Sequence, residues 1–491
     1  MEFFATVHTP GFIWRFAMNR LFVILLAFTF LASCAMNPVS GERELALVSE
    51  SQEIEIGRQS AAAAESQLGL VEDPRLQDYV QRLGTQLAEA SERPSLPWTF
   101  RVVDDPTPNA FAAPGGFIFV TRGLLALMGN EAEFVSVLGH EIGHVTARHS
   151  VSRMSRQQLA QIGLGVGAII SPQIAKFSDL AAGGLQVLFL SYGRDDERQA
   201  DDLGYRYALT QNYDVREMVN VFASLQHSAE LAGRSPIPTW LASHPNPAER
   251  IVRIEKRLET LPAASQPRRI GEDAYMTHID GLMYGTNPRN GYFEENRFLH
   301  PGLAFRLDLP EGWQTQNLAQ FVVGGSPAND AIIQLSIVPG GRSEAADTFF
   351  AQEGLVPGRA GAEKVNGLGA IIGRFEAQTE QGKLGGIAAF ITLAERTYQI
   401  VAYTPAEKLS GYENVFRRSI NSFDRLTDRD ALARQPSRLE IVRLPRSMTL
   451  TQFNRTYPST IPLNELVVIN QLSGPDSTMP ARYPAKRVTD H

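Results

Sequence analysis

Apolar side chains recur at the three-to-four-residue spacing of an amphipathic helix over several stretches of the first 260 residues. The clearest stretches are residues 52–90, 130–150 and 248–260, and a charged helix begins near Arg194. In the second stretch, Asn130 can cap the first turn while the apolar positions that follow pack inward. The pattern therefore predicts that the N-terminal half is mainly helical.

Shorter segments in the same half have other patterns. Residues 98–103 predict a strand, and residues 111–121 predict a second one after a Pro-Gly-Gly bend. Residues 157–192 are apolar and contain several glycines, which predicts a buried helical hairpin. A membrane-dipping element or a lid over a site are the alternatives, because neither half reaches the roughly 20 apolar residues that span a bilayer.

The period changes in the C-terminal half, where apolar and polar residues alternate. A helix is expected at residues 344–354, between strands. The expected strands are residues 303–309, 331–338, 386–393 and 398–403. Together they predict a small α+β domain over residues 300–430. The last segment, residues 431–491, resembles a degenerate LysM module and implies contact with peptidoglycan or with protein.

Length and charge narrow the class of protein. The chain has 491 residues, enough for two to four folded units at about 100–200 residues each. Hydrophobic residues make up 43% and charged residues 20%, an ordinary globular balance. The net charge of −7 provides no summed positive field for a phosphate backbone, so nucleic acid is not an expected partner.

The N-terminus has the layout of a signal peptide. Arg15 and Arg20 precede an apolar run over residues 21–31, which small residues follow. Residues 31–34, Leu-Ala-Ser-Cys, resemble the bacterial lipobox, in which the cysteine is acylated. Cys34 is the only cysteine, so no internal disulfide can form. The alternative is an ordinary secretory signal that contains a cysteine by chance.

The residue after the cysteine indicates which membrane holds the anchor. Ala35 follows Cys34 where an Asp would be expected for the inner membrane, and in this the sequence resembles lipoproteins that are forwarded to the outer membrane. We therefore expect a protein on the periplasmic side of the envelope, anchored to the outer membrane by lipid.

Residues 140–144, His-Glu-Ile-Gly-His, fit the HExxH pattern on the capped helix. Residues four apart share a helical face, so His140 and His144 can bind one zinc ion, which keeps a position open for water. Glu141 can take the proton of that water. A chance match is the alternative. His149, five residues after His144, is rotated off this face, and we interpret it as structural or supporting rather than as a ligand.

A third protein ligand is required, and Glu197 is a candidate. Glu197 and Asp201 share one helical face, so Asp201 can accept the second ring N–H of a ligand histidine. Periodicity alone favours the alternative, the solvated start of a charged helix.

These residues together resemble a known family. The HEIGH sequence, Glu-x-x-Ala-Asp at 197–201 and Ser-His-Pro at 243–245 resemble the HExxH zinc metallopeptidase family of the CAAX prenyl protease, HtpX and periplasmic BepA and LoiP, over roughly residues 45–260. The resemblance implies one zinc ion per subunit, bound by His140, His144 and Glu197, with Glu141 as catalytic base and Asp201 as a supporting residue. His244 would stabilise the oxyanion or cap the zinc in a latent state.

The resemblance extends to the segment before the HExxH helix, where the family receives the substrate backbone on an edge strand. The implied substrate-binding residues are Asn109, Phe111, Ala112, Gly115 and Gly116. Addition of an extended peptide to a strand edge requires little side-chain specificity, which suits unfolded or misfolded substrates. The chain lacks the helical TPR repeats of BepA, so partner choice does not carry over from it.

The sequence thus predicts an α+β protein with a mainly helical, zincin-like (gluzincin) catalytic domain and a small β-sheet, then a small α+β domain and a LysM-like module. The expected layout is a signal peptide at 1–33, a lipidated tether at 34–50, the metallopeptidase domain at 51–265, a linker at 266–299, the α+β domain at 300–430 and the LysM-like segment at 431–491. The expected activity is zinc-dependent hydrolysis of misfolded or stalled envelope proteins. Two alternatives remain, a chaperone-like assembly factor with a latent zinc site and a cell-wall hydrolase.

Overall fold

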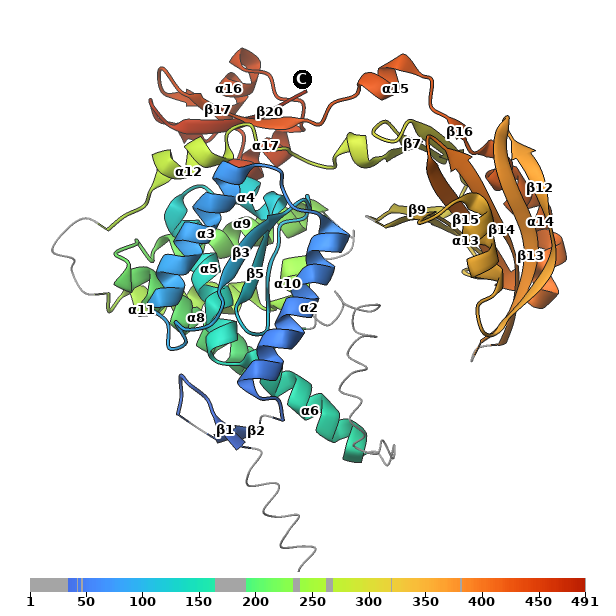
Figure 1. Cartoon of the computed structure of the whole chain (residues 1–491). Helices are drawn as coiled ribbons and strands as arrows, with labels where there is room; N and C mark the ends of the chain where they lie inside the picture. The colour runs from blue at the N-terminus through green and yellow to red at the C-terminus, as the bar shows by residue number, and fades with distance from the viewer. Residues whose placement is uncertain are drawn as a thin grey trace, which may run out of the picture. The chain divides into compact units, whose positions relative to one another are not determined.

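The computed structural model describes residues 34–41, 43–45, 47–163, 191–232, 239–261, 268–318, 320–379 and 382–490. The chain divides into two compact units (Figure 1), which are described one at a time. The first comprises Met1–Glu65, Leu70–Ile279 and Val467–Ser477. The second comprises Ser66–Gly69, Asp280–Leu466 and Thr478–His491.

Helices form most of the first unit, as the sequence predicts. They are α2 (Glu50–Leu68), α3 (Pro74–Glu89), α4 (Arg122–Leu127), α5 (Glu131–Thr146), α6 (His149–Gly163), α8 (Arg194–Thr210), α9 (Glu217–Ala232), α10 (Thr239–Ser243), α11 (Pro247–Leu258) and α12 (Glu272–Ile279). The expected helix over residues 52–90 is two helices, because Gly69 adopts a left-handed backbone and Asp73 caps a new start. Strands β1 (Cys34–Met36) and β2 (Arg43–Leu45) pair within the expected tether.

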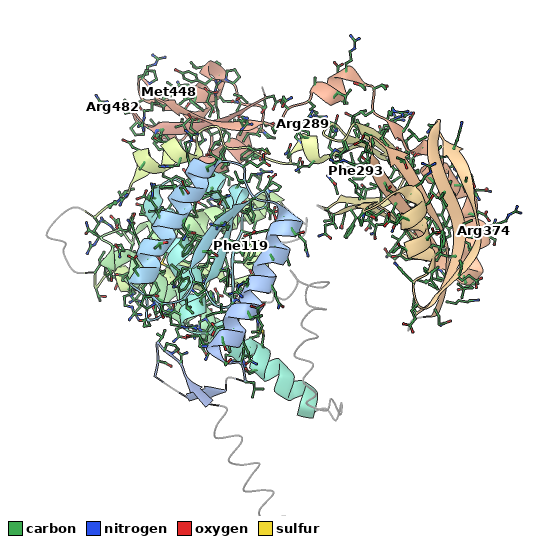
Figure 2. All side chains as sticks on the ribbon, in the orientation of Figure 1. Phe119, Arg289, Phe293, Arg374, Met448 and Arg482 are labelled. Atoms are coloured by element: carbon green, nitrogen blue, oxygen red, sulfur yellow. The ribbon has the colours of Figure 1, made fainter. Side chains whose placement is uncertain are left out.

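A three-stranded sheet packs beside these helices. It consists of β3 (Thr99–Val103), β4 (Ala110–Ala113) and β5 (Phe117–Thr121) in the order β3-β5-β4. The single strand expected at 111–121 is in fact an antiparallel hairpin, because Gly115 and Gly116 turn the chain with φ of 78° and 107°. Phe119, labelled in Figure 2, belongs to β5. Its ring stacks on that of Phe111 across the hairpin, with ring centroids 5.1 Å apart.

Helix α5 is the buried centre of the unit: all 16 of its residues are buried. Its neighbour α8 approaches closely because both helices present glycine at the contact. A Cβ on Gly204 would lie 2.8 Å from the backbone nitrogen of His140, and one on Gly139 would lie 3.0 Å from the Cα of Gly204. Small residues at this crossing therefore set how near the side chains of α8 come to those of α5.

The second unit is a separate α+β body. Its strands are β6 (Tyr292–Glu294), β7 (Arg297–His300), β8 (Phe305–Asp308), β9 (Gln314–Asn317), β10 (Phe321–Gly325), β11 (Ile332–Val338), β12 (Leu355–Val365), β13 (Leu368–Thr379), β14 (Gly382–Leu393), β15 (Arg396–Pro405) and β16 (Asp424–Arg425). A seven-stranded sheet has the order β12-β13-β14-β15-β11-β10-β9, and helices α13 (Arg342–Phe350) and α14 (Leu409–Ser422) pack on it. The mixed α+β class is confirmed.

The C-terminal segment follows short helix α15 (Arg429–Ala433). Strand β17 (Arg438–Arg443) pairs antiparallel with β20 (Pro484–Thr489), and β18 (Met448–Thr449), α16 (Leu450–Thr456), α17 (Leu463–Ile469) and β19 (Thr478–Met479) lie between them in the chain. The end of α17 and the residues up to Ser477 belong to the first unit.

Within the described ranges, no helix is both long and apolar enough to span a membrane. The hairpin expected at 157–192 falls mostly on residues 164–190, which lie outside the described residues.

Candidate metal centre

Local capping determines where the HExxH helix begins and ends. The Asn130 side chain accepts a hydrogen bond from the backbone N–H of Glu133 at 2.9 Å, as the sequence predicts. The helix was expected to run to about residue 150, but it ends at Thr146, because Arg148 adopts a left-handed backbone with φ of 58°. His149 begins the next helix instead of continuing α5.

Helix α8 brings the distant acidic residues to α5. Glu197 lies in its first turn and Asp201 one turn later, and both are buried against α5. A solvated helix start, the alternative that periodicity alone favours, does not describe this buried face.

Four side chains form one buried group of possible metal ligands: His140, His144, Glu197 and His244, each with a donor atom within 4.8 Å of the others. The Nε2 atoms of His140 and His144 are 3.0 Å apart. Glu197 places Oε1 3.4 Å from His144 Nε2 and Oε2 3.7 Å from His140 Nε2. Donors about 2.0–2.1 Å from a tetrahedral ion would lie roughly 3.3 Å from one another, so this spacing fits a metal.

The ring hydrogen bonds support the same conclusion. His140 Nδ1 lies 3.0 Å from Asp201 Oδ1 and 3.2 Å from Nη2 of Arg250. Because a carboxylate only accepts, and Nη2 of Arg250 already donates to Asp201 at 2.6 Å, the shorter contact places the proton on Nδ1. His144 Nδ1 is likewise engaged, 2.9 Å from Nδ1 of His149. The two Nε2 lone pairs then face each other, an arrangement that repels without a cation between them. The residues present therefore fit a bound metal ion.

Arg250, on α11, joins the two carboxylates of α8. It donates to both oxygens of Asp201 at 2.9 and 2.6 Å and lies 2.9 Å from Oε2 of Glu197. Burial works to raise the pKa of Glu197, but the charges of His244 and Arg250 hold that pKa well below its usual value. The pKa of Asp201 is lowered against burial by Arg250 and by the hydrogen bond with His140.

Glu141 and His244 are the remaining polar groups of the centre. Neither carboxylate oxygen of Glu141 has a hydrogen-bond partner, and Oε1 lies 3.5 Å from Nε2 of His244. Burial raises the pKa of the Glu141 carboxyl. His244 Nδ1 lies 2.9 Å from Oε1 of Glu197 and 3.2 Å from Nε2 of His140, so its ring bridges Glu197 and Glu141.

Aromatic rings pack on the imidazoles. Tyr192 stacks on His144 with centroids 3.8 Å apart, and Trp240 stacks on His244 at 4.9 Å. Burial lowers the pKa of His144 well below its usual value, which keeps this ring neutral and able to bind a metal.

The residues expected to bind substrate lie on the hairpin. Asn109 directly precedes β4, which is one of the two edge strands of the sheet and packs against α5. Phe111 and Ala112 lie within this strand, and Gly115 and Gly116 form its turn. All five are buried, and Oδ1 of Asn109 has no hydrogen-bond partner. Cys34 begins β1, far from this group in the sequence.

Four residues of the centre escaped the sequence analysis: the stacking rings of Tyr192 and Trp240, and the polar side chains of Arg250 and Gln199. Arg250 occurs in an amphipathic helix, and nothing in its spacing distinguishes it from its solvated neighbours. Gln199, which accepts a hydrogen bond from Nε2 of His149 at 2.8 Å, has no sequence signal at all.

Comparisons with known proteins give relatives that are named as proteases. A putative beta-barrel assembly-enhancing protease of Vibrio cholerae is 32% identical over 202 residues, covering 39% of this chain and 41% of the relative. The beta-barrel assembly-enhancing protease of Escherichia coli is 28% identical over 263 residues, covering 52% of this chain and 53% of the relative. The mitochondrial metalloendopeptidase OMA1 of Schizosaccharomyces pombe is 29% identical over 204 residues, covering 40% of this chain and 56% of the relative.

The chain spans about half the length of the curated relatives it matches. Among solved structures, cyanobacterial PsbP from Synechocystis matches 26% of this chain at 13% identity, covering 91% of PsbP, and its TM-score of 0.22 is too low to assign a fold. The sequence profile described as Peptidase family M48 matches residues 74–258, the part that holds His140, His144, Glu197 and His244. Residues 74–258 therefore form a metallopeptidase domain of peptidase family M48.

Proposed function

We propose that the protein is a zinc-dependent endopeptidase that hydrolyses misfolded or stalled proteins of the bacterial cell envelope. The buried group of His140, His144 and Glu197, with the unpartnered carboxylate of Glu141 beside it, carries this proposal. The two imidazoles and one carboxylate are a ligand set that zinc uses in catalytic sites.

Each residue of the centre has a separate role in the proposed hydrolysis. Zinc held by the three ligands would polarise a water molecule and lower its pKa to about 7. Glu141 accepts the proton of this water and returns it to the leaving amine, and its raised pKa makes it a stronger base than an exposed glutamate. His244, with Nε2 3.5 Å from Glu141, donates to the oxyanion that forms on the substrate carbonyl.

The substrate backbone would add to the edge of the sheet at β4, which packs against the metal-binding helix α5. Asn109, Phe111 and Ala112 would contact the peptide, and the turn at Gly115 and Gly116, which packs closely on Ile54 and Leu96, would hold the strand edge in position. Pairing through main-chain groups accepts many sequences, which suits unfolded clients.

Envelope substrates are proposed from the relatives, two of which bear the name beta-barrel assembly-enhancing protease. The lipobox-like sequence at Cys34 supports a lipid anchor, with Ala35 favouring the periplasmic face of the outer membrane. The β17-α16-α17-β20 order of the C-terminal segment is compatible with a LysM-like contact to peptidoglycan or protein.

A second candidate function is that of a chaperone-like outer-membrane assembly factor with a latent metal site. His244 favours it, because Nδ1 lies 2.9 Å from Glu197 and 3.2 Å from His140, where a fourth ligand would be. A fourth protein ligand would close the position that catalysis needs.

The test compares residues 35–491 with Glu141→Gln and His244→Ala, measuring zinc content and casein cleavage. The proposal expects about one zinc per chain and cleavage by the parent, while Glu141→Gln retains zinc without cleaving. Faster cleavage by His244→Ala would support the latent site. Zinc without cleavage by either the parent or His244→Ala would favour the assembly factor, and absence of zinc would refute both functions.

A further inference from the structure

His149 lies against the metal centre although its position in the sequence points away from it. Five residues separate it from His144, which on a continuous helix would rotate it about 140° off the metal-binding face. In the structure it is buried, and its Nδ1 lies 2.9 Å from Nδ1 of His144.

A strained residue produces this approach. Arg148 adopts the left-handed conformation with φ of 58°, which breaks the path of α5 and turns His149 toward the centre. A non-glycine residue there costs roughly 1–2 kcal/mol. Arg148 is held by hydrogen bonds from Nε to Oε2 of Glu53 and from Nη2 to the carbonyl oxygen of Val48, both at 2.9 Å. The surrounding structure thus enforces the turn, as is common near functional sites.

The hydrogen bonds define which nitrogen carries each proton. The carbonyl oxygen of Gln199 only accepts, so His149 Nε2, at 2.8 Å, is the donor. A neutral His149 then has a lone pair on Nδ1, and it accepts from the Nδ1–H of His144. The lone pair of His144 is left on Nε2, which faces His140 Nε2 at 3.0 Å and Glu197 Oε1 at 3.4 Å.

We propose that His149 is a positioning residue for the metal: it fixes the tautomer and ring orientation of His144, as Asp201 does for His140. This inference rests on the proposed metal-dependent function. Within the described residues, the centre already holds the carboxylates of Glu141, Glu197 and Asp201 beside the guanidinium of Arg250, and Asp196 lies 3.9 Å from Nε2 of His149. A neutral imidazole acceptor orients His144 without adding a further negative charge to this buried group.

Packing alone is the competing explanation, because Tyr192 also holds the His144 ring by stacking. Two substitutions separate the explanations. His149→Phe keeps a ring of similar size without an acceptor, whereas His149→Gln keeps a carbonyl acceptor without the ring. Ser152→Ala, on the same helix α6, is the matched control.

The measurement is the zinc dissociation constant of residues 35–491 by competition with a chromophoric chelator, together with the visible spectrum of the Co²⁺-loaded chain. We expect zinc binding about 10–100-fold weaker for His149→Phe, with an altered Co²⁺ spectrum, and substantial recovery for His149→Gln. Parent-like affinity of His149→Phe, or equal losses for both variants, would overturn the inference.

Metal-free thermal unfolding shows whether each variant folds. If His149→Phe does not fold, Gln199→Met replaces it, since this variant keeps the imidazole but releases its tautomer. Gln199→Met should also weaken zinc binding and alter the Co²⁺ spectrum, and parent-like values would refute the role. A parent protein that binds no zinc would refute the proposed function. If the parent binds zinc and cleaves casein while His149→Phe binds zinc with the affinity of the parent, only this inference is refuted.

Discussion

Replacing Arg250 with methionine should destabilise the first unit far more than an ordinary arginine substitution. The guanidinium is only 4% exposed and neutralises two buried carboxylates, Asp201 and Glu197. It also lies over the rings of Phe222, at 4.3 Å, and Trp240, at 4.9 Å. Methionine fills a similar volume but leaves both carboxylates without their cation.

The magnitude follows from this burial. Removing one partner of a buried ion pair costs about 3–5 kcal/mol, because the remaining charge stays uncompensated. For a domain of this size each kcal/mol shifts Tm by roughly 2–4 °C, so Arg250→Met should unfold about 6–20 °C below the parent. The loss should be smaller with zinc, since the bound cation then neutralises Glu197 and only Asp201 is left uncompensated.

Thermal unfolding followed by circular dichroism, with chelator and with zinc, measures both effects. Arg253→Met is a matched control on the same helix: Arg253 pairs with Asp202, the neighbour of Asp201, but at a partly exposed position. Such pairs contribute about 0–1 kcal/mol. If metal-free Arg250→Met unfolds within about 2 °C of Arg253→Met, the buried ion pairs do not hold the centre together, and the reasoning fails.

Three further predictions concern other parts of the chain. Gly204→Ala should lower stability and zinc affinity although alanine favours a helix by about 1 kcal/mol, because the added Cβ would lie 2.8 Å from the nitrogen of His140; a stabilised variant would contradict the close packing. The side-chain amide of Gln471 donates to Oε2 of Glu133 at 2.7 Å, and Gln471→Glu would place a second carboxylate there. This variant should therefore be less stable than Gln471→Ala by about 1 kcal/mol, measured as a lower Tm, and equal Tm values for the two variants would exclude the contact. Burial lowers the pKa of His300 to about 4, so between about pH 6.5 and 4 the unfolded chain binds a proton that the folded chain does not. Urea unfolding should then show stability falling by roughly 2–3 kcal/mol as pH decreases through that window, and His300→Asn should show a flatter profile.

The parts of the fold that the sequence predicted well are those with a local cause. Asn130 and the apolar spacing after it predicted the start of α5, and the side chain of Asn130 caps the helix as expected. The helix at 248–260 and the alternating segments after residue 300 also appear, as α11 and as β8, β11, β14 and β15. In each case a periodic pattern was packed on one face, and tertiary contacts reinforced it.

The parts that the sequence missed depend on contacts between distant segments. The end of α5 could not be predicted, because the left-handed Arg148 is held by Glu53, 95 residues earlier in the chain. Arg250 and Arg253 lie three residues apart in the same amphipathic helix, and their spacing does not distinguish them. Only the fold shows that Arg250 is the one that faces the buried carboxylates of α8. Helical geometry indicates that His149 is not a metal ligand, and the group of possible ligands does not include it, but its contact with His144 depends on the break of the helix at Arg148.

The burial of the centre links the two candidate functions. His140, Glu141, His144, Glu197 and His244 are at most 3% exposed, so an extended peptide cannot reach them as they stand. Hydrolysis therefore requires that the covering groups move, and His244, which contacts both Glu197 and His140, is the group whose movement would open the proposed metal position. His244 directly follows the five-residue helix α10. Arg250, which contacts Glu197, lies on α11, and the left-handed residue Asn246 separates the two positions in the chain. A shift of His244 away from Glu197 would leave Arg250 in contact with Glu197, so opening would keep the three proposed metal ligands together. An endopeptidase and a latent assembly factor would differ in the fraction of molecules in which His244 lies away from the site. The substitution His244→Ala removes the ring from every molecule and so represents the fully open extreme.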